Sequence, residues 1–272
     1  MARPEIGDTG LARQSLAIVR RNLIHIKRMP EMLMDVTVQP VMFVLLFAFV
    51  FGSSIAVPGT PGGYREWLLG GIMAQTVAFS SFIVAVGLTA DIDKGIVDRM
   101  RSLPINPAAI LTGRSISSLM HSSIGIAVMS VTGLAIGWRI RHGVLDALLA
   151  YGLLLLWGFA MIWLGILVGS TMRSVEAVNG VMFSTMFPVT FLANTFAPTD
   201  HMATWLRTIA EWNPISSLTQ AVRERWGNAV PAPDTAAWPL HHPVLATVLW
   251  TVALTAVLAP LSLRAFNRRT RT

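Results

Sequence analysis

Six long apolar segments constrain this chain most, because each is about as long as a helix that crosses a bilayer, which needs ~20 mainly apolar residues. They cover approximately residues 32–51, 67–90, 119–138, 148–170, 175–193 and 244–265. Charged residues make up only 13% of the chain and the mean hydropathy is +0.59. The sequence therefore predicts an all-α integral membrane protein with six transmembrane helices.

Basic residues between these segments predict the orientation. Fifteen of the 21 Lys and Arg residues lie before the first segment, between the second and third, between the fourth and fifth, or at the end of the last segment and beyond it. Only six lie in the alternate loops. Because positive residues in short loops stay on the cytoplasmic side, both termini are expected in the cytoplasm.

The formal net charge of +7 is spread between apolar runs and does not form one stripe. This distribution favours contact with anionic membrane lipids over nucleic-acid binding. The chain has no cysteine, which excludes disulfides and thiolate metal sites, and the sequence predicts no other metal site and no catalytic residue.

Residues 1–30 are expected to form a cytoplasmic tail with an amphipathic helix. Its apolar side chains recur at spacings of three and four, at Ala12, Leu16, Val19, Leu23 and Ile26. Such a helix suits the membrane interface, although an ordinary solvated basic helix fits the same pattern. Residues 267–272 are expected to form a second basic cytoplasmic tail.

The loop after the second segment, about residues 91–102, alternates charges with apolar residues such as Ile92, Ile96 and Val97. One face is then apolar and the other charged, which predicts a short surface helix. From periodicity alone, this helix fits a docking element for a partner and a solvated connector equally well.

About residues 194–240, between the fifth and sixth segments, form a long outer connection. Two amphipathic stripes, around Trp205 and around Leu218, flank a break at Asn213-Pro214. Tryptophan suits the headgroup region, so these short helices are expected on, or dipping into, the outer interface.

The second and fifth segments provide a candidate substrate pathway. The fifth mixes amide and hydroxyl groups with Met and Phe, which suits a large amphiphile; alternatively, the hydroxyls bond only to their own helix. The pathway residues are predicted to be Met73, Gln75, Phe79, Asn179, Phe183, Met186, Phe187 and Asn194.

Small residues recur one turn apart at Gly133 and Gly137 and at Gly165 and Gly169. Such pairs let two helices approach closely, either within one chain or across a dimer seam. The sequence leaves both possibilities open.

Three stretches, VTVQPVMFVLLFAFVFG at 36–52, WLLGGI at 67–72 and GIVDRMRSLP at 95–104, resemble the ABC-2 permease family, in particular its daunorubicin/doxorubicin-resistance branch. The later stretch from Ala197-Pro198 through Asn213-Pro214 to Arg223 is similar to the outer re-entrant region of that family. In this order, with six segments and a basic amphipathic helix before them, the motifs cover the whole chain.

The resemblance implies the fold of a type V-like ABC exporter in a bacterial plasma membrane, with an N-terminal elbow helix. It implies a coupling helix that docks on a separate ATP-binding subunit, with the coupling residues Asp91, Asp93, Lys94, Gly95, Asp98, Arg99, Met100 and Arg101. It also implies an outer gate in the re-entrant segment, formed by Trp205, Asn213, Pro214 and Arg223.

The chain contains no Gly-x-x-x-x-Gly-Lys-Ser/Thr loop, so it lacks the backbone cradle that holds nucleotide phosphates. ATP and Mg²⁺ are therefore expected on a separate ATPase, and this chain is expected to pair with a second copy or a paralogue. The expected cargo is hydrophobic or amphipathic, drug-like or lipid-like. A polysaccharide or glycolipid exporter is the alternative, and an intramembrane enzyme or a passive channel are more remote ones.

Overall fold

A computed structural model describes residues 31–269, apart from 53, 54, 56, 58, 61, 102–106 and 201. The predicted helix within residues 1–30 therefore lies outside the described residues. The described part is helical, and its elements are α2 (Glu31–Val50), α3 (Gly63–Asp93), α4 (Ile96–Arg101), α5 (Pro107–Ala135), α6 (Val144–Thr171), α7 (Val175–Phe191), α8 (Thr204–Trp212), α9 (Pro214–Trp226), α10 (Trp238–His241) and α11 (Pro243–Arg269).

Each of the six predicted apolar segments overlaps one helix, namely α2, α3, α5, α6, α7 or α11. The bounds differ most for α5, which begins at Pro107 where the apolar segment was predicted to begin at about residue 119. Within the described residues, four of these helices are long and apolar enough to cross a membrane: α3, α5, α6 and α11. In α2, which has 20 residues, the apolar stretch with described side chains is Thr37–Val50, and α7 has only 17 residues. The all-helical prediction is confirmed, with four long candidate spans.

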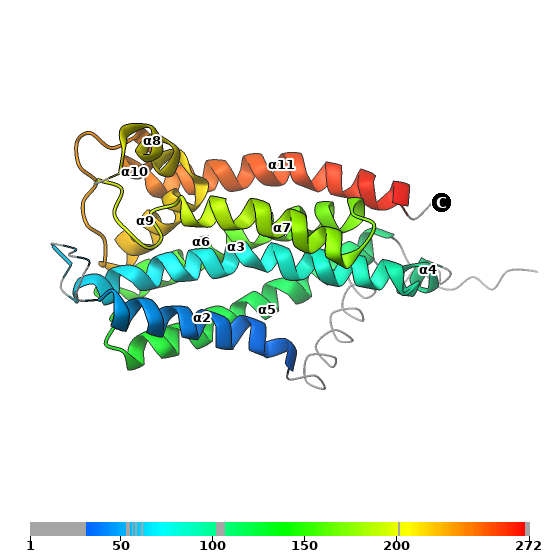
Figure 1. Ribbon diagram of the computed structural model, residues 1–272, viewed down its shortest axis with the longest axis horizontal. Coiled ribbons are helices and arrows are strands. Elements are labelled where there is room, and N and C mark those ends of the chain that lie inside the picture. The colour runs from blue at the N-terminus through cyan, green and yellow to red at the C-terminus, as the bar shows by residue number, and fades with distance from the viewer. Residues whose placement is uncertain are drawn as a thin grey trace, which may run out of the picture.

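The long helices run along one axis, and α3 lies between α2 and α7 (Figure 1). Short helix α4 lies at one end of this bundle, hereafter the α4 end, and α8, α9 and α10 lie at the other, hereafter the α9 end. The most extensive contacts join α6 to α3 and to α11, while α7 packs mainly against α3. Helices α3 and α6 therefore form the centre of the fold, and α11 packs against the other side of α6 with much of its surface exposed.

Glycines explain the close approach of α6 to α3. A Cβ added to Gly165 would lie 2.4 Å from the carbonyl oxygen of Ser81, and one on Gly169 would lie 2.7 Å from that of Ala85. This glycine pair packs within the chain. Gly133 likewise packs against Leu69, whereas Gly137 ends α5 with a φ of 104°, a conformation that glycine adopts without strain.

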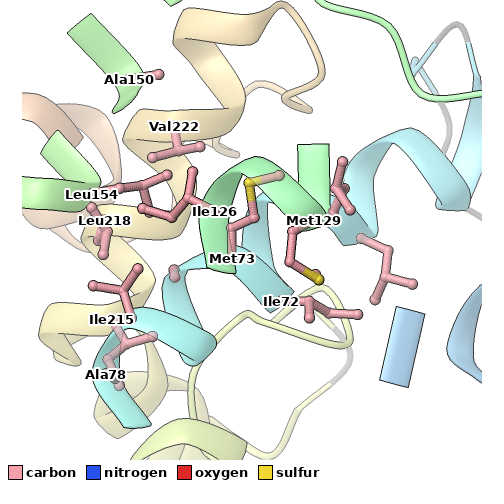
Figure 2. Packing of buried hydrophobic residues seen from close by; sticks show 14 of the residues in the cluster. Ile72, Met73, Ala78, Ile126, Met129, Ala150, Leu154, Ile215, Leu218 and Val222 are labelled. Atoms are coloured by element: carbon pink, nitrogen blue, oxygen red, sulfur yellow. The ribbon is translucent and has the colours of Figure 1, made fainter. Parts of the chain in front are cut away.

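Short helix α9 is packed inside the largest apolar core, against α3, α6 and α11. Its residues Ile215, Leu218 and Val222 join Met73 of α3 and Leu154 of α6 in one cluster (Figure 2). The outer connection thus folds back into the bundle at the α9 end. By contrast, the outward faces of the long helices expose many aliphatic side chains, as expected of helices that contact lipid.

Candidate functional site

A pocket of about 350 Å³ lies between α2, α3 and α7. Helix α2 contributes Phe43, α3 contributes Phe79 and Phe82, and α7 contributes further aromatic rings. Among the described residues, no ionisable side chain lines it. The lining consists of Gln39, Pro40, Phe43, Ile72, Gln75, Thr76, Phe79, Phe82, Ile83, Phe183, Phe187 and Phe191.

Four of the predicted pathway residues line this pocket: Gln75, Phe79, Phe183 and Phe187. The others lie elsewhere. Met73 is fully buried in the main core, and Met186 packs with Val178 and Met182 on the face of α7 toward α3. Asn194 is buried beyond the end of α7, and Asn179 is exposed near its start.

The sequence prediction missed the contribution of α2 to the pocket. Gln39 and Phe43 are four residues apart, so they share one face of that helix. The spacing was visible in the sequence, but nothing there indicated that this face turns toward α3 and α7. Phe82 and Phe191 were missed for the same reason.

A stack of aromatic rings in contact, with one tilted pair (Phe191 and Phe196), continues from the pocket toward the α9 end. Centroids lie 4.1 Å apart for Phe187 and Phe191, 4.9 Å for Phe191 and Phe196, and 4.4 Å for Phe196 and Phe47. The stack thus runs from α7 through the following loop to α2. The Tyr64 hydroxyl donates to the Phe196 carbonyl over 2.8 Å and fixes that loop. The pocket is therefore bounded by aromatic rings at this end.

The pocket combines a large aromatic surface with a few hydrogen-bonding groups. The Thr76 hydroxyl donates to the Ile72 carbonyl, whereas the Gln75 side chain, only 7% exposed, presents an amide to the lining. Aromatic walls with a few polar groups are typical of sites that bind apolar or amphipathic small molecules.

At the α4 end, the predicted coupling segment divides between two helices. Residues up to Asp93 complete α3, Gly95 turns the chain with a φ of 65°, and α4 begins at Ile96. Asp91 pairs with Arg114 of α5 over 2.6 Å, and Asp93 pairs with Arg269 of α11 over 3.1 Å.

Of the remaining predicted coupling residues, Lys94 and Arg99 are exposed. The side chains of Asp98, Met100 and Arg101 lie outside the described part. Val97 is buried, in an apolar cluster that includes Leu88, Leu111 and Phe266. Helix α4 is thus anchored to the bundle on one face, and exposed basic groups lie on it (Arg99) and just before it (Lys94).

At the α9 end, Arg223 is fully buried. Its guanidinium donates to the carbonyls of Trp67, Asn194 and Thr195 over 2.7, 3.0 and 3.0 Å and lies 3.4 Å from the Trp67 ring centroid. No carboxylate of the described residues lies within ion-pair distance of it. Carbonyl dipoles and a ring face therefore stabilise this charge and hold α9 to α3.

Two glycines of α3 leave the space that the Arg223 side chain occupies. A Cβ on Gly70 would lie 3.0 Å from the Arg223 Cγ, and one on Gly71 would lie 2.3 Å from the Thr195 carbonyl oxygen and 2.9 Å from Arg223 Nη2. The WLLGGI motif thus brings the backbone of α3 next to the loop after α7 and to α9.

A second polar cluster at this end centres on the buried carboxylate of Glu66 in α3. Arg141 donates to it twice, over 2.9 and 2.6 Å, and Asn228 donates over 3.2 Å. The hydrogen bonds to Glu66 raise the pKa of Arg141 above its usual range. Asn228 also accepts from Trp138 over 2.8 Å, so the cluster ties α3 to the α5–α6 connection and to the end of α9.

The other predicted gate residues have distinct positions. Asn213 caps α9, because its side chain accepts from the Ile215 backbone over 2.9 Å, and Pro214 occupies the first helical position. The helix break lies where the sequence predicted it. Trp205 is exposed on α8, on the same face as Ile209 and Trp212.

Comparison with known proteins shows that the chain matches the sequence model of a protein family. A model described as "ABC-2 type transporter" matches residues 13–225. The chain is 28% identical over 249 residues to the daunorubicin resistance ABC transporter permease protein DrrB1 of Streptomyces coeruleorubidus, covering 92% of this chain and 84% of that protein.

Two further relatives are more distant. The probable doxorubicin resistance ABC transporter permease protein DrrC of Mycobacterium tuberculosis is 22% identical, over 82% of this chain and 76% of its own. The probable multidrug ABC transporter permease YbhR of Escherichia coli is 19% identical, over 59% and 44%.

Proposed function

This chain belongs to the ABC-2 type transporter family, and we propose that it is the permease of an exporter of hydrophobic or amphipathic compounds, drug-like or lipid-like. The observation that carries this proposal is the pocket between α2, α3 and α7, with its aromatic walls and buried Gln75 amide. A neutral, aromatic-lined pocket binds flat apolar groups by ring stacking and orients their polar edges through the amide.

In this proposal, all six apolar helices cross a bacterial plasma membrane, and the α4 end and both termini are cytoplasmic. The excess of Lys and Arg in the corresponding connections supports this orientation. The exposed aromatic face of α8, with Trp205 and Trp212, then lies at the opposite interface, where tryptophan is favoured.

Energy comes from a separate ATP-binding subunit, which holds ATP and Mg²⁺ and docks at α4. Exposed Lys94 and Arg99 support docking there, because they present basic groups at and just before an anchored helix. A second permease copy or a paralogue covers α7. That helix packs mainly on α3, and Val181, Phe183 and Phe187 on it are exposed.

The cargo enters the pocket from the cytoplasm or the inner leaflet. It leaves toward the α9 end when the stack of Phe191, Phe196 and Phe47 separates. Arg223 and Glu66 hold the surrounding backbone during this step, because both are buried and hydrogen-bonded across several helices.

The test is ATP-driven uptake of doxorubicin into inverted vesicles that contain this chain and its ATP-binding subunit. Replacing Phe183 and Phe187 by Ala removes two stacking surfaces of ~0.5–1.5 kcal/mol each. Affinity for doxorubicin should then fall roughly tenfold, with unchanged membrane abundance. Replacing Leu249 and Val252 on the exposed face of α11 is the matched control and should leave uptake unchanged.

Two results would contradict the proposal. One is the absence of ATP-dependent movement of any probe from a panel of anthracyclines, dyes, lipids and lipid-linked glycans. The other is robust ATP hydrolysis by the purified chain alone, because that would remove the need for a partner ATPase. Movement of lipid-linked glycans only would change the cargo class while keeping the exporter.

A further inference from the structure

The two acidic residues at the end of α3 have partners inside the bundle. We infer that Asp91 and Asp93 are positioning residues, which fasten the end of α3 to α5 and α11 so that a displacement of α4 moves these helices together. They are then not docking contacts for the ATP-binding subunit. This inference rests on the proposed function and assigns its force-transmitting residues.

The first link joins α3 to α5. Asp91 Oδ2 and Arg114 Nη1 lie 2.6 Å apart, and the two side chains are 26% and 18% exposed. A Cβ on Gly87 would lie 2.6 Å from Arg114 Nη2, so the guanidinium crosses α3 where that helix has no side chain. A partly buried ion pair in such a slot restrains both helices more than a fully solvated pair does.

The second link joins α3 to α11 and α6. Arg269 donates to Asp93 over 3.1 Å, to the Gly169 carbonyl over 2.9 Å and to the Met172 carbonyl. The Thr89 hydroxyl donates to the same Gly169 carbonyl over 3.0 Å. A cation thus meets the C-terminal carbonyls of α6, where the helix dipole favours it, and Asp93 neutralises it.

Helix α4 packs through Val97 against the ends of α3, α5, α6 and α11, hereafter the block. The Val97 side chain is buried in a cluster with Leu88 of α3, Leu111 of α5, Ile166 of α6 and Phe266 of α11. A displacement of α4 is therefore transmitted to all four helices through one packed contact. The two ion pairs prevent α3 from rotating independently of α5 and α11.

Helix α7 is attached differently. No ion pair joins it to another helix within the described ranges. The pocket has Gln75 and Phe79 on α3 and Phe183 and Phe187 on α7. Movement of the block against α7 would therefore change the pocket width, which connects the α4 end to cargo binding.

The experiment uses the complete complex in vesicles, with doxorubicin as the probe. Asp91→Asn and Arg114→Gln should each leave co-purification of the ATP-binding subunit and basal ATP turnover unchanged. Doxorubicin moved per ATP should fall about fivefold, as for loss of a coupled pair. The exchange D91R/R114D should recover about half of that loss, because the pair is re-formed in reverse.

The matched control is the pair Arg225–Asp146 at the α9 end, with a 2.9 Å separation and side chains 39% and 35% exposed. Asp146→Asn should leave the transport-to-turnover ratio unchanged. If Asp91→Asn instead releases the ATP-binding subunit or abolishes its turnover, Asp91 is a docking contact and the inference is wrong. An unchanged ratio in both single variants would equally overturn it.

A distance measurement separates this inference from the proposed function. The chain has no cysteine, so labels at Leu261→Cys on α11 and Ala177→Cys in the first turn of α7 have no background. Both positions are exposed, and Ala177 lies before the Val181–Phe187 stretch assigned to the second permease copy. Nucleotide trapping should shift their separation in the otherwise native complex, and Asp93→Asn should abolish the shift. If this shift occurs but doxorubicin is not transported, only the proposed cargo is wrong. If no shift occurs in the otherwise native complex, the proposed transmission through the two ion pairs is wrong.

Discussion

Gly71 offers a sharp test of how α9 is held in the bundle. The structure places its α-carbon so close to the loop after α7 that an added Cβ would lie 2.3 Å from the Thr195 carbonyl oxygen and 2.9 Å from the Thr195 Cα. Backbone atoms cannot rotate away as a flexible side chain can. Gly71→Ala must therefore push α3 away from this loop and from the Arg223 guanidinium, 2.9 Å from the same Cβ.

The expected change in the free energy of unfolding is the balance of two opposing effects. Overpacking in a close-packed interior costs ~1–3 kcal/mol. Alanine in a helix gains up to ~1 kcal/mol over glycine, which offsets part of that cost. Gly152→Ala on α6 is the matched control, because nothing lies within 4 Å of its added Cβ, so it should show only the gain. The two variants should differ by roughly 2 kcal/mol.

The assay is thermal unfolding of the detergent-solubilised chain, followed by the fluorescence of its nine tryptophans. At ~2–4 °C per kcal/mol, Gly71→Ala should melt roughly 6 °C below Gly152→Ala. Equal melting temperatures, or a higher one for Gly71→Ala, would mean that α3 does not approach the Thr195 backbone this closely.

Two further predictions concern α9. Arg223→Lys keeps the charge but loses the flat contact with Trp67 and most of the three carbonyl hydrogen bonds. The same melt should therefore show a loss of stability of roughly 3 kcal/mol. An unchanged midpoint would mean that the planar shape of the guanidinium is unimportant. Burial raises the pKa of Glu224, against an opposing hydrogen bond from Gln220, so the stability linked to its bound proton is lost as pH rises through that raised pKa. Glu224→Gln should therefore melt above the unchanged chain near neutral pH and level with it below about pH 4.3, the ordinary Glu value, whereas a pH-independent difference would contradict the burial effect.

Local sequence accounts for the apolar helices and for the boundary between α8 and α9. Apolar runs of sufficient length predicted α2, α3, α5, α6, α7 and α11, because burial in lipid or protein favours helices wherever the backbone needs internal hydrogen bonds. Asn213 and Pro214 were recognisable as a break, and they cap and begin α9, since both act on neighbouring backbone groups.

The sequence predicted only part of the lining of the candidate site. Aromatic and amide residues on α3 and α7 were recognisable as pathway candidates, but the contribution of Gln39 and Phe43 depends on how α2 is rotated against α3. Rotation is set by the packing of side chains from several helices at once. Hydropathy along one segment contains no such information.

The charge pattern predicted which connections share the basic side of the membrane, and the WLLGGI and GIVDRMRSLP stretches already resembled the family to which the chain belongs. The partners of the charged side chains, by contrast, depend on how the helices pack. Asp93 meets Arg269 from 176 positions away, and Arg223 meets Trp67 from 156. Propensity and periodicity act over a few residues, whereas these contacts exist because packed helices bring distant residues within hydrogen-bond reach.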